Sequence, residues 1–172
     1  MRRMTHQSGS RGFTAPALTA ITCLIALLAL GPVALSATRT NATVSLRTTK
    51  LGQVLVNASG HTLYLFAKDA NGKSACSGSC AADWPPLLSH GKPSAGSGVK
   101  ASLLGTTSRK NGSLQVTYNK HPLYTYTDDK QPGQTSGEGS SAFGAKWYAV
   151  SARGTAIIKT STSSTTTTNP YR

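Results

Sequence analysis

The chain contains an internal repeat with an offset of 60 residues. The segment His61-Thr-Leu-Tyr-Leu-Phe-Ala-Lys-Asp69 returns as His121-Pro-Leu-Tyr-Thr-Tyr-Thr-Asp-Asp129. Seven of the twenty positions from 50 to 69 are identical in the two copies, including the upstream residues Lys50, Gly52 and Val56, which return as Lys110, Gly112 and Val116. A repeat of this kind indicates one supersecondary unit built twice, and it constrains the fold more than any other feature of the sequence.

Each copy is predicted to be a β-hairpin. Strand-forming residues at 53–56 and 114–118 are followed by polar turns at 57–60 and 119–120, and the repeated phrase then returns as a second strand. These are hairpin signals. We therefore predict a mainly β fold, with a single small domain built from two related β-hairpin repeats.

The aromatic residues of the repeated phrase are expected to share one face of the returning strand. Side chains alternate along a strand, so Tyr64 and Phe66 lie on one face and the leucines beside them lie on the other. The second copy places Tyr124 and Tyr126 together in the same way. Two such aromatic pairs predict the core of a small β domain.

Each phrase ends in an aspartate where turn residues begin. Asp69 and Asp129 come three residues after the second aromatic of each copy. An aspartate in this place can accept hydrogen bonds from the backbone amides of the turn. We interpret both residues as turn caps, with a ligand-binding or catalytic role as the alternative.

Two cysteines, Cys76 and Cys80, follow the first copy. An even pair in an exported protein is typical of a disulfide, which we place in a short helical turn that ends before Pro85. The alternatives are a redox pair or half of a metal site. Redox motifs usually hold two intervening residues, whereas this pair holds three, and no second cysteine pair completes a zinc site.

The sequence predicts two repeat segments and three segments without regular structure. Repeat 1 covers 50–90 and repeat 2 covers 109–159, with a Gly, Ser and Pro-rich linker and connecting segment at 91–108. Residues 37–49 are predicted to be a flexible N-terminal segment. Residues 160–172 are rich in Ser and Thr with little to bury, and they are predicted to be a disordered tail.

The first 36 residues are predicted to be a signal peptide. A basic start without acids precedes an apolar run at 15–30, and small residues follow near position 36. An uncleaved membrane anchor is the alternative, because the run is barely long enough to cross a bilayer. No lipid anchor is expected at Cys23, which lies inside the apolar run and lacks a small residue just before it.

Together these features resemble the bacterial secreted repeat, or predicted lipoprotein, family that carries a Tyr-x-aromatic-x-x-Asp motif. The motif stands here as Tyr64-x-Phe66-x-x-Asp69 and Tyr124-x-Tyr126-x-x-Asp129, and the cysteine pair, Trp84-Pro85-Pro86 and Trp147 resemble further landmarks of the family. The resemblance covers residues 50–151. It implies an exported cell-envelope protein of unknown biochemical function, and the missing lipid-attachment cysteine is a departure from the family pattern.

The charge of the chain favours anionic partners. The sequence holds 18 Lys and Arg against 5 Asp and Glu, a net charge of +13, and loss of the leader with its three arginines leaves +10. We expect an anionic cell-wall polymer or a membrane surface as partner, with plain solubility as the other reading because the basic residues are scattered. No basic stripe is interleaved with aromatics, so no nucleic acid ligand is expected.

No catalytic motif is present in the sequence, which lacks a nucleophile elbow, a zinc-protease helix and a phosphate loop. We expect a non-catalytic binding or structural module without a cofactor. The alternative is a metal-binding or redox-associated protein in which His61 and His121, at equivalent positions, approach one site. The competing interpretation makes both histidines exposed turn residues, and the sequence carries no signal for an oligomeric state.

Overall fold

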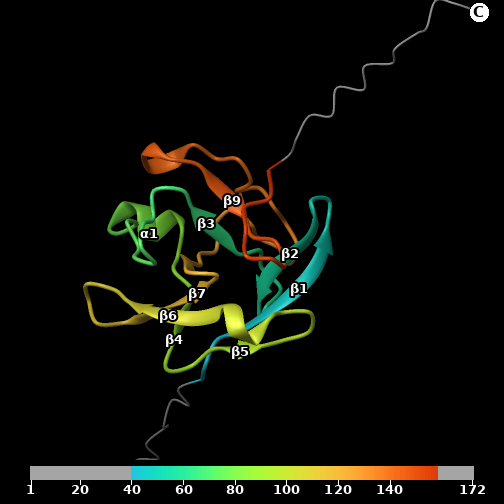
Figure 1. Ribbon diagram of the computed structural model, residues 1–172. Coiled ribbons are helices and arrows are strands. Elements are labelled where there is room, and N and C mark those ends of the chain that lie inside the picture. Colours follow the sequence, from blue (N-terminus) through green and yellow to red (C-terminus); the bar gives the residue numbers. More distant parts are fainter. Residues whose placement is uncertain (1–39, 159–172) are drawn as a thin grey trace, which may run out of the picture. The chain divides into compact units, whose positions relative to one another are not determined.

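Two antiparallel hairpins form the scaffold (Figure 1). Strand β1 (Thr43–Thr49) pairs with β2 (Gly52–Asn57), and β6 (Leu104–Ser108) pairs with β7 (Leu114–Tyr118). Gly52 and Gly112 stand in the two hairpin turns with φ of 88° and 80°, a left-handed conformation that strains any residue with a Cβ atom. The two glycines are equivalent positions of the 60-residue repeat, so the turn between the first two strands is repeated as well.

The computed structural model describes residues 40–158, which belong to one compact unit. The predicted signal peptide at 1–36 and the predicted tail at 160–172 lie outside the described residues. Within 40–158, no helix is both long and apolar enough to cross a membrane.

Short strands extend the two hairpins and join them. Strand β5 (Ser94–Ala95) runs parallel to β1, while β4 (Leu88–Ser89) and β8 (His121–Pro122) both pair with β7. Strand β3 (Tyr64–Phe66) pairs antiparallel with β9 (Trp147–Ala149). The remaining elements are α1 (Ser79–Asp83) and two 3-10 turns, η1 (Ala101–Leu103) and η2 (Ala142–Gly144). The predicted mainly β fold of two related repeats is confirmed.

Each motif strand pairs with the closing segment of the other repeat. In the first copy, β3 pairs with β9 in a register that aligns Phe66 with Trp147. In the second copy, Thr125 N donates to Pro85 O at 2.9 Å and Thr127 N donates to Asp83 O at 3.0 Å. The two repeats are therefore interleaved, and the motif strands lie where they meet.

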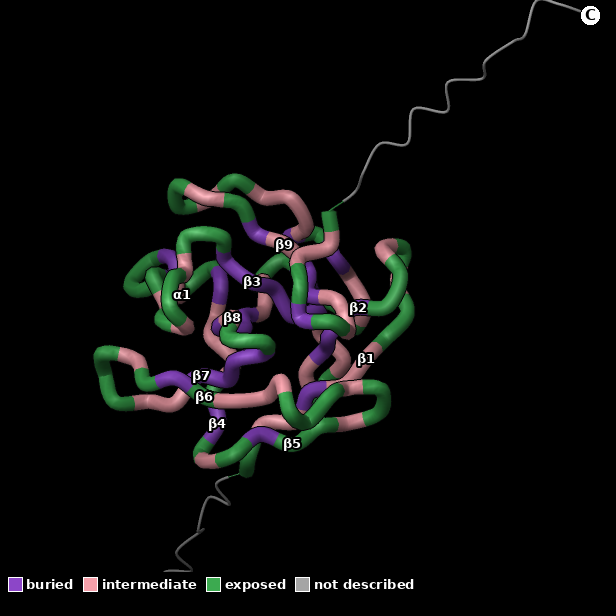
Figure 2. The backbone as a smooth tube through the Cα atoms, in the orientation of Figure 1, coloured by how far each residue is buried: buried purple, intermediate pink, exposed green. Residues whose placement is uncertain are grey.

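The core consists of two clusters, one on each face of the motif strands, and buried residues run along β2, β3 and β7 (Figure 2). The aromatic core contains Val54, Val56, Tyr64, Phe66, Cys76, Cys80, Trp84, Tyr124, Trp147 and Ala149. The aliphatic core contains Val44, Leu55, Leu63, Leu65, Val116, Tyr118, Leu123 and Val150. The predicted alternation is confirmed, because the motif aromatics enter the first cluster and the leucines beside them enter the second.

The predicted boundaries differ from the structure at the start of each repeat. The segment 37–49 was expected to be flexible, but Thr43–Thr49 forms β1, with Val44 fully buried in the aliphatic core. The segment 91–108 was expected to be a linker, but it contains β5, η1 and β6. Strand β6 has the small polar composition of a linker, and it is a strand because β7 supplies its backbone hydrogen bonds. Each repeat therefore begins one strand earlier than predicted.

Substituting Gly137→Ala should test the packing between the repeats. A Cβ at Gly137 would lie 2.6 Å from Trp84 Cη2 and 3.1 Å from Tyr64 Cε1, and neither ring can move without disturbing the aromatic core. We expect the free energy of unfolding, measured by urea denaturation, to fall by about 1–3 kcal/mol. The neighbouring Ser136→Ala change at an exposed side chain serves as the control and should stay within about 0.5 kcal/mol. Equal stabilities for the two variants would contradict this packing.

Candidate functional site

The two copies of the motif bind each other reciprocally. Tyr64 Oη donates to Asp129 Oδ2 at 2.5 Å, and Tyr124 Oη donates to Asp69 Oδ2 at 2.8 Å. Their backbones pair as well, since Tyr64 N donates to Tyr124 O at 2.8 Å and Tyr124 N donates to Tyr64 O at 3.0 Å. We call these four residues the tyrosine–aspartate clasp. Their reciprocal contacts define an approximate twofold relation between the repeats.

The second oxygen of each aspartate holds a turn. Asp69 Oδ1 accepts a hydrogen bond from Ala75 N at 2.7 Å, and Asp129 Oδ1 accepts one from Ser136 N at 2.8 Å. Each aspartate therefore accepts a backbone amide of the segment after the motif, six residues on for Asp69 and seven residues on for Asp129. What the sequence did not show is that each aspartate also binds the tyrosine of the other repeat.

The third position of the motif extends the same exchange to the aromatic rings. Phe66 stacks on Trp147 with ring centroids 4.1 Å apart, and Tyr126 stacks on Trp84 at 4.1 Å. The two tryptophans stack on each other at 4.0 Å, which completes a run of four rings. Each motif aromatic thus stacks on the tryptophan of the other repeat. The clasp tyrosines make edge contacts with this stack, Tyr64 to Trp84 at 5.4 Å and Tyr124 to Trp147 at 5.1 Å.

Burial sets the protonation of the clasp. Desolvation raises the pKa of the Tyr64 phenol well above its usual value near 10, and the hydrogen bond and charge of Asp129 raise it further. Desolvation likewise raises the pKa of Tyr124 and of the Asp69 carboxyl. Both phenols therefore remain hydrogen-bond donors at neutral pH, which is the state that the clasp requires.

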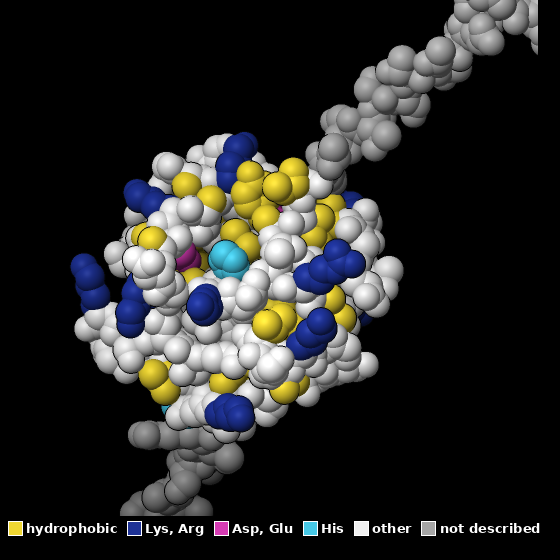
Figure 3. Space-filling model, in the orientation of Figure 1, with side chains coloured by type: hydrophobic (Ala, Val, Ile, Leu, Met, Phe, Trp, Pro, Cys, Tyr) yellow, Lys and Arg dark blue, Asp and Glu magenta, His cyan; other side chains and the backbone are white. Residues whose placement is uncertain are grey.

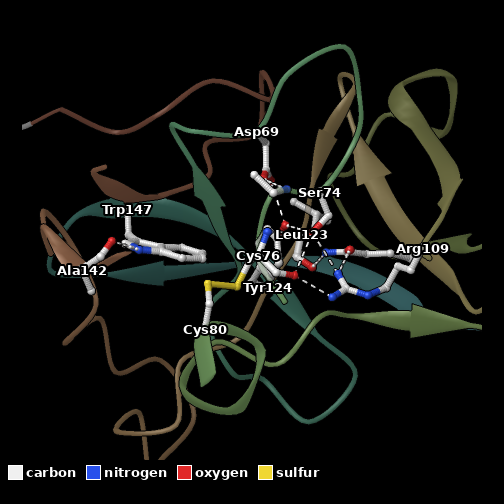
Figure 4. Close-up of a disulfide and its surroundings, with 11 residues drawn as sticks. Asp69, Ser74, Cys76, Cys80, Arg109, Leu123, Tyr124, Ala142 and Trp147 are labelled. Carbon is white, nitrogen blue, oxygen red and sulfur yellow. Dashed lines mark hydrogen bonds between the residues drawn. A yellow bond between two sulfur atoms is a disulfide. The ribbon is translucent and has the colours of Figure 1, made fainter. Parts of the chain in front are cut away.

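A polar network continues from Tyr124 to Arg109, beside the disulfide (Figure 4). The Tyr124 hydroxyl also lies 2.7 Å from Ser74 Oγ. Arg109 donates from Nη1 to Ser74 Oγ at 3.0 Å and to Gln115 Oε1 at 2.5 Å, and from Nη2 to Cys76 O at 2.7 Å. Gln115 is fully buried and its Nε2 donates to Leu123 O at 2.9 Å. Neutral oxygens thus hold the guanidinium in a fixed position.

This network lies against a cavity of about 540 Å³, which we call the Arg109 cavity. Its lining comes from the turn around the disulfide and from the β6–β7 turn, and consists of Lys73, Ser74, Ala75, Cys76, Ser77, Gly78, Ala81, Ser108, Arg109, Lys110 and Asn111. Three of these residues are basic and none is acidic. The cavity is therefore the candidate functional site.

The sequence prediction missed this site, although the repeat contained a signal for it. At the offset of 60 residues, Arg109 stands where the first copy has Thr49, and Gln115 stands where the first copy has Leu55. A polar residue in a buried strand position and a charge at the turn both depart from the repeat. Neither feature is matched by the first copy, which has no equivalent of this network.

Two segments of the chain, 45–88 and 105–151, match the sequence profile of a family described as a secreted repeat of unknown function. The chain belongs to this family. Each matched segment starts within the first strand of a hairpin, β1 or β6, so the secreted repeat has the boundaries seen in the fold. No curated protein and no solved structure matches the chain. The family description supports the predicted extracellular location.

The disulfide predicted for this secreted repeat protein is present. Cys76 and Cys80 are bonded, with Cα atoms 5.3 Å apart, and both side chains are buried in the aromatic core. Cys80 lies in α1, which confirms the predicted disulfide-bearing helical turn, and the helix ends just before Trp84. The bond occurs in the first repeat alone among the described residues.

The two histidines of the secreted repeats do not share a cavity. His61 Nδ1 lies 2.9 Å from Asp129 O, whereas His121 lines a cavity with Asp69, Asn71 and Lys120, and His61 is not part of that lining. The twofold relation explains this placement, because it puts each histidine beside the aspartate of the other repeat rather than beside the other histidine. In the part of the chain that the structure describes, no group of three or more His, Cys, Asp or Glu side chains could hold a metal ion.

A double-mutant cycle on the clasp should reveal its strength. Tyr64→Phe leaves a buried carboxylate oxygen of Asp129 without its donor, which should lower the free energy of unfolding by about 1–3 kcal/mol. Combining it with Asp129→Ala should give a coupling energy of about 0.5–3 kcal/mol by urea denaturation. Tyr148→Phe is the matched control, because the Tyr148 hydroxyl makes no hydrogen bond in the range 40–158. Strictly additive effects would refute the clasp.

Alkaline pH should destabilise the protein through the same two phenols. Because their pKa values are raised in the folded state, the folded protein retains protons that the unfolded chain releases above about pH 10. Stability is therefore complete below that pH and falls above it, by about 1.4 kcal/mol per pH unit for each phenol. Urea denaturation at a series of alkaline pH values measures the slope, which Tyr64→Phe should reduce by about half. A slope unchanged by this substitution would argue against burial of the phenol.

Proposed function

We propose that the protein is a non-catalytic binding module of the cell envelope that attaches to anionic polymers of the cell wall. The observation that carries the proposal is the distribution of charge over the surface. The basic side chains are mostly exposed, whereas most of the acidic ones are buried or half-buried.

Nearly all basic residues of the described region lie at the surface. Residues 40–158 contain twelve Lys and Arg against five Asp and Glu, a net charge of +7. Eleven of the twelve are exposed, and Arg109 is the half-buried exception. Figure 3 shows Lys and Arg side chains spread over the visible face, with little acidic surface between them.

The fold withdraws three of the five acids from the surface, while Asp83 and Asp128 stay exposed. Asp129 is buried at 3% exposure and Asp69 is half-buried, and both are engaged in the tyrosine–aspartate clasp. Glu138 is also half-buried, and its Oε2 accepts a hydrogen bond from Ala149 N at 2.7 Å. The one ion pair in the described range joins Lys130 and Asp128 at 3.7 Å, with both side chains mostly exposed. Folding therefore increases the positive character of the surface.

A surface of this kind suits a polyanion better than a small ligand. Single exposed charges contribute little each, but a polymer with repeated negative groups engages many of them together. The attraction is screened by salt, with a Debye length of about 8 Å at physiological ionic strength. This mode of binding requires no catalytic group, which is consistent with the use of the motif phenols and carboxylates to join the repeats.

Sedimentation with isolated cell walls over a salt series tests the proposal. We expect the protein to co-sediment at low salt and to be released progressively as salt rises, because the contacts are electrostatic. Walls stripped of their anionic polymers should retain much less protein. A variant in which Lys50, Lys68, Lys92 and Lys100 are all changed to Gln should be released at lower salt.

These four lysines are exposed and their side chains make no hydrogen bond or ion pair within the described residues, so the variant should keep the stability of the parent. If the walls retain no protein at low salt, or retain it equally at every salt concentration, the proposal is wrong. The positive surface charge would then serve only to keep the protein soluble.

A further inference from the structure

Arg109 differs from every other basic residue that the structure describes. It is half-buried, whereas the other eleven are exposed. It donates hydrogen bonds to neutral oxygens of Ser74, Gln115 and Cys76, and no carboxylate of the described residues lies within ion-pair distance. A guanidinium that no carboxylate contacts directly keeps much of its attraction for an anion.

The Arg109 guanidinium also has N–H donors that no residue of the described chain accepts. An arginine side chain carries five N–H groups, and three are used by Ser74 Oγ, Gln115 Oε1 and Cys76 O. The remaining two, on Nε and on Nη2, have no acceptor among the residues at 40–158. Parallel N–H groups on Nε and Nη2 of an arginine match the two oxygens of a carboxylate or a phosphate.

The cavity at Arg109 adds two more positive charges. Lys73 and Lys110 line it, both are exposed, and neither ammonium group makes a hydrogen bond within the described chain. Asp69 is the nearby carboxylate. Desolvation raises its pKa and the charge of Arg109 offsets part of that rise, but Asp69 does not line the cavity, and its oxygens accept from Ala75 and Tyr124. An anion in the cavity would therefore meet three cations and no acid on its walls.

The size and the remaining walls indicate a small ligand. About 540 Å³ lies within the range of roughly 300–1,000 Å³ typical of small-molecule sites. Ala75, Ala81 and Cys76 of the disulfide add apolar groups to the lining. The cavity can therefore accommodate a charged group together with a short uncharged body.

We propose that the Arg109 cavity is a specific site for an oxyanion group, a carboxylate or a phosphate, carried by a small molecule or by the end of a chain. Arg109 binds the group with its two free N–H donors, and Lys73 and Lys110 supply further charge. This inference deepens the proposed function, because it gives the cell-envelope module one defined pocket in addition to its diffuse positive surface. The carboxylates and phosphates of envelope polymers share the required chemistry.

Titration of the full chain with inorganic phosphate and, separately, with acetate tests the site. Amide chemical shifts are followed by NMR at constant ionic strength, so that general screening does not change. We expect saturable shifts confined to 73–78 and 108–111, together with a shift of the Arg109 Nε–H signal. The anion that binds more tightly identifies the preferred group.

The variants avoid Arg109 itself, because it also holds Ser74, Gln115 and Cys76 in place. Lys73→Gln with Lys110→Gln should weaken binding about tenfold. Lys92→Gln with Lys100→Gln removes the same charge outside the cavity and should leave the affinity within about twofold. Ser77→Trp should block the cavity while keeping its charge, and the exposed position of Ser77 should preserve the fold.

Three results would overturn the site: no saturable shift with either anion, shifts spread over all exposed lysines, or equal weakening by the two double variants. Failure of the protein to bind cell walls would not decide the test of the site, because inorganic phosphate and acetate probe the cavity without any polymer. Conversely, the protein could be retained by walls in a salt-sensitive way and yet show no saturable shift with either anion. That result would refute the anion site and leave the proposed wall-binding function standing.

Discussion

The structure depends on the exchange of contacts between the two copies of the motif. Each tyrosine binds the aspartate of the other repeat, and each following aromatic stacks on the other repeat's tryptophan. One repeat alone would leave a buried aspartate without its phenol donor and an aromatic ring without its stacking partner. These contacts explain the spacing of the motif. The strand period of two puts both aromatic side chains on one face, and the turn after the strand brings the aspartate to the tyrosine of the other repeat.

The same exchange shapes the surface. A chain with few acids uses two of them to join its repeats and a third to hold β9, and the exposed charge that results is mostly positive. Stability and surface charge are thus linked in this protein through its carboxylates. The turn around the disulfide also affects the surface charge. The backbone carbonyl of Cys76 is one of the three oxygens that hold the Arg109 guanidinium in place.

Much of this fold could be predicted from the repeat, and the parts that could not have physical reasons. The alternation of Tyr64 and Phe66 with leucines predicted two packed faces, and both core clusters follow it. Strand β6 escaped prediction because its Leu-Gly-Thr-Thr-Ser sequence contains glycine and small polar residues without apolar alternation, and pairing with β7 decides its structure. The partners of Asp69 and Asp129 escaped as well, since contacts between residues more than fifty positions apart leave no local pattern. The Arg109 cavity is formed where the second copy departs from the first, so the periodicity that predicts the fold gives no direct indication of the site.

The central claim is that the reciprocal contacts make the two repeats one cooperative unit. Native-state hydrogen exchange at the amides of Tyr64 and Tyr124 tests it most directly, because each amide donates to the carbonyl of the other residue. The account predicts that both amides exchange only through global unfolding, with the same free energy. Exchange of one amide at a free energy lower by more than about 1 kcal/mol would show that its repeat opens independently and would contradict the account.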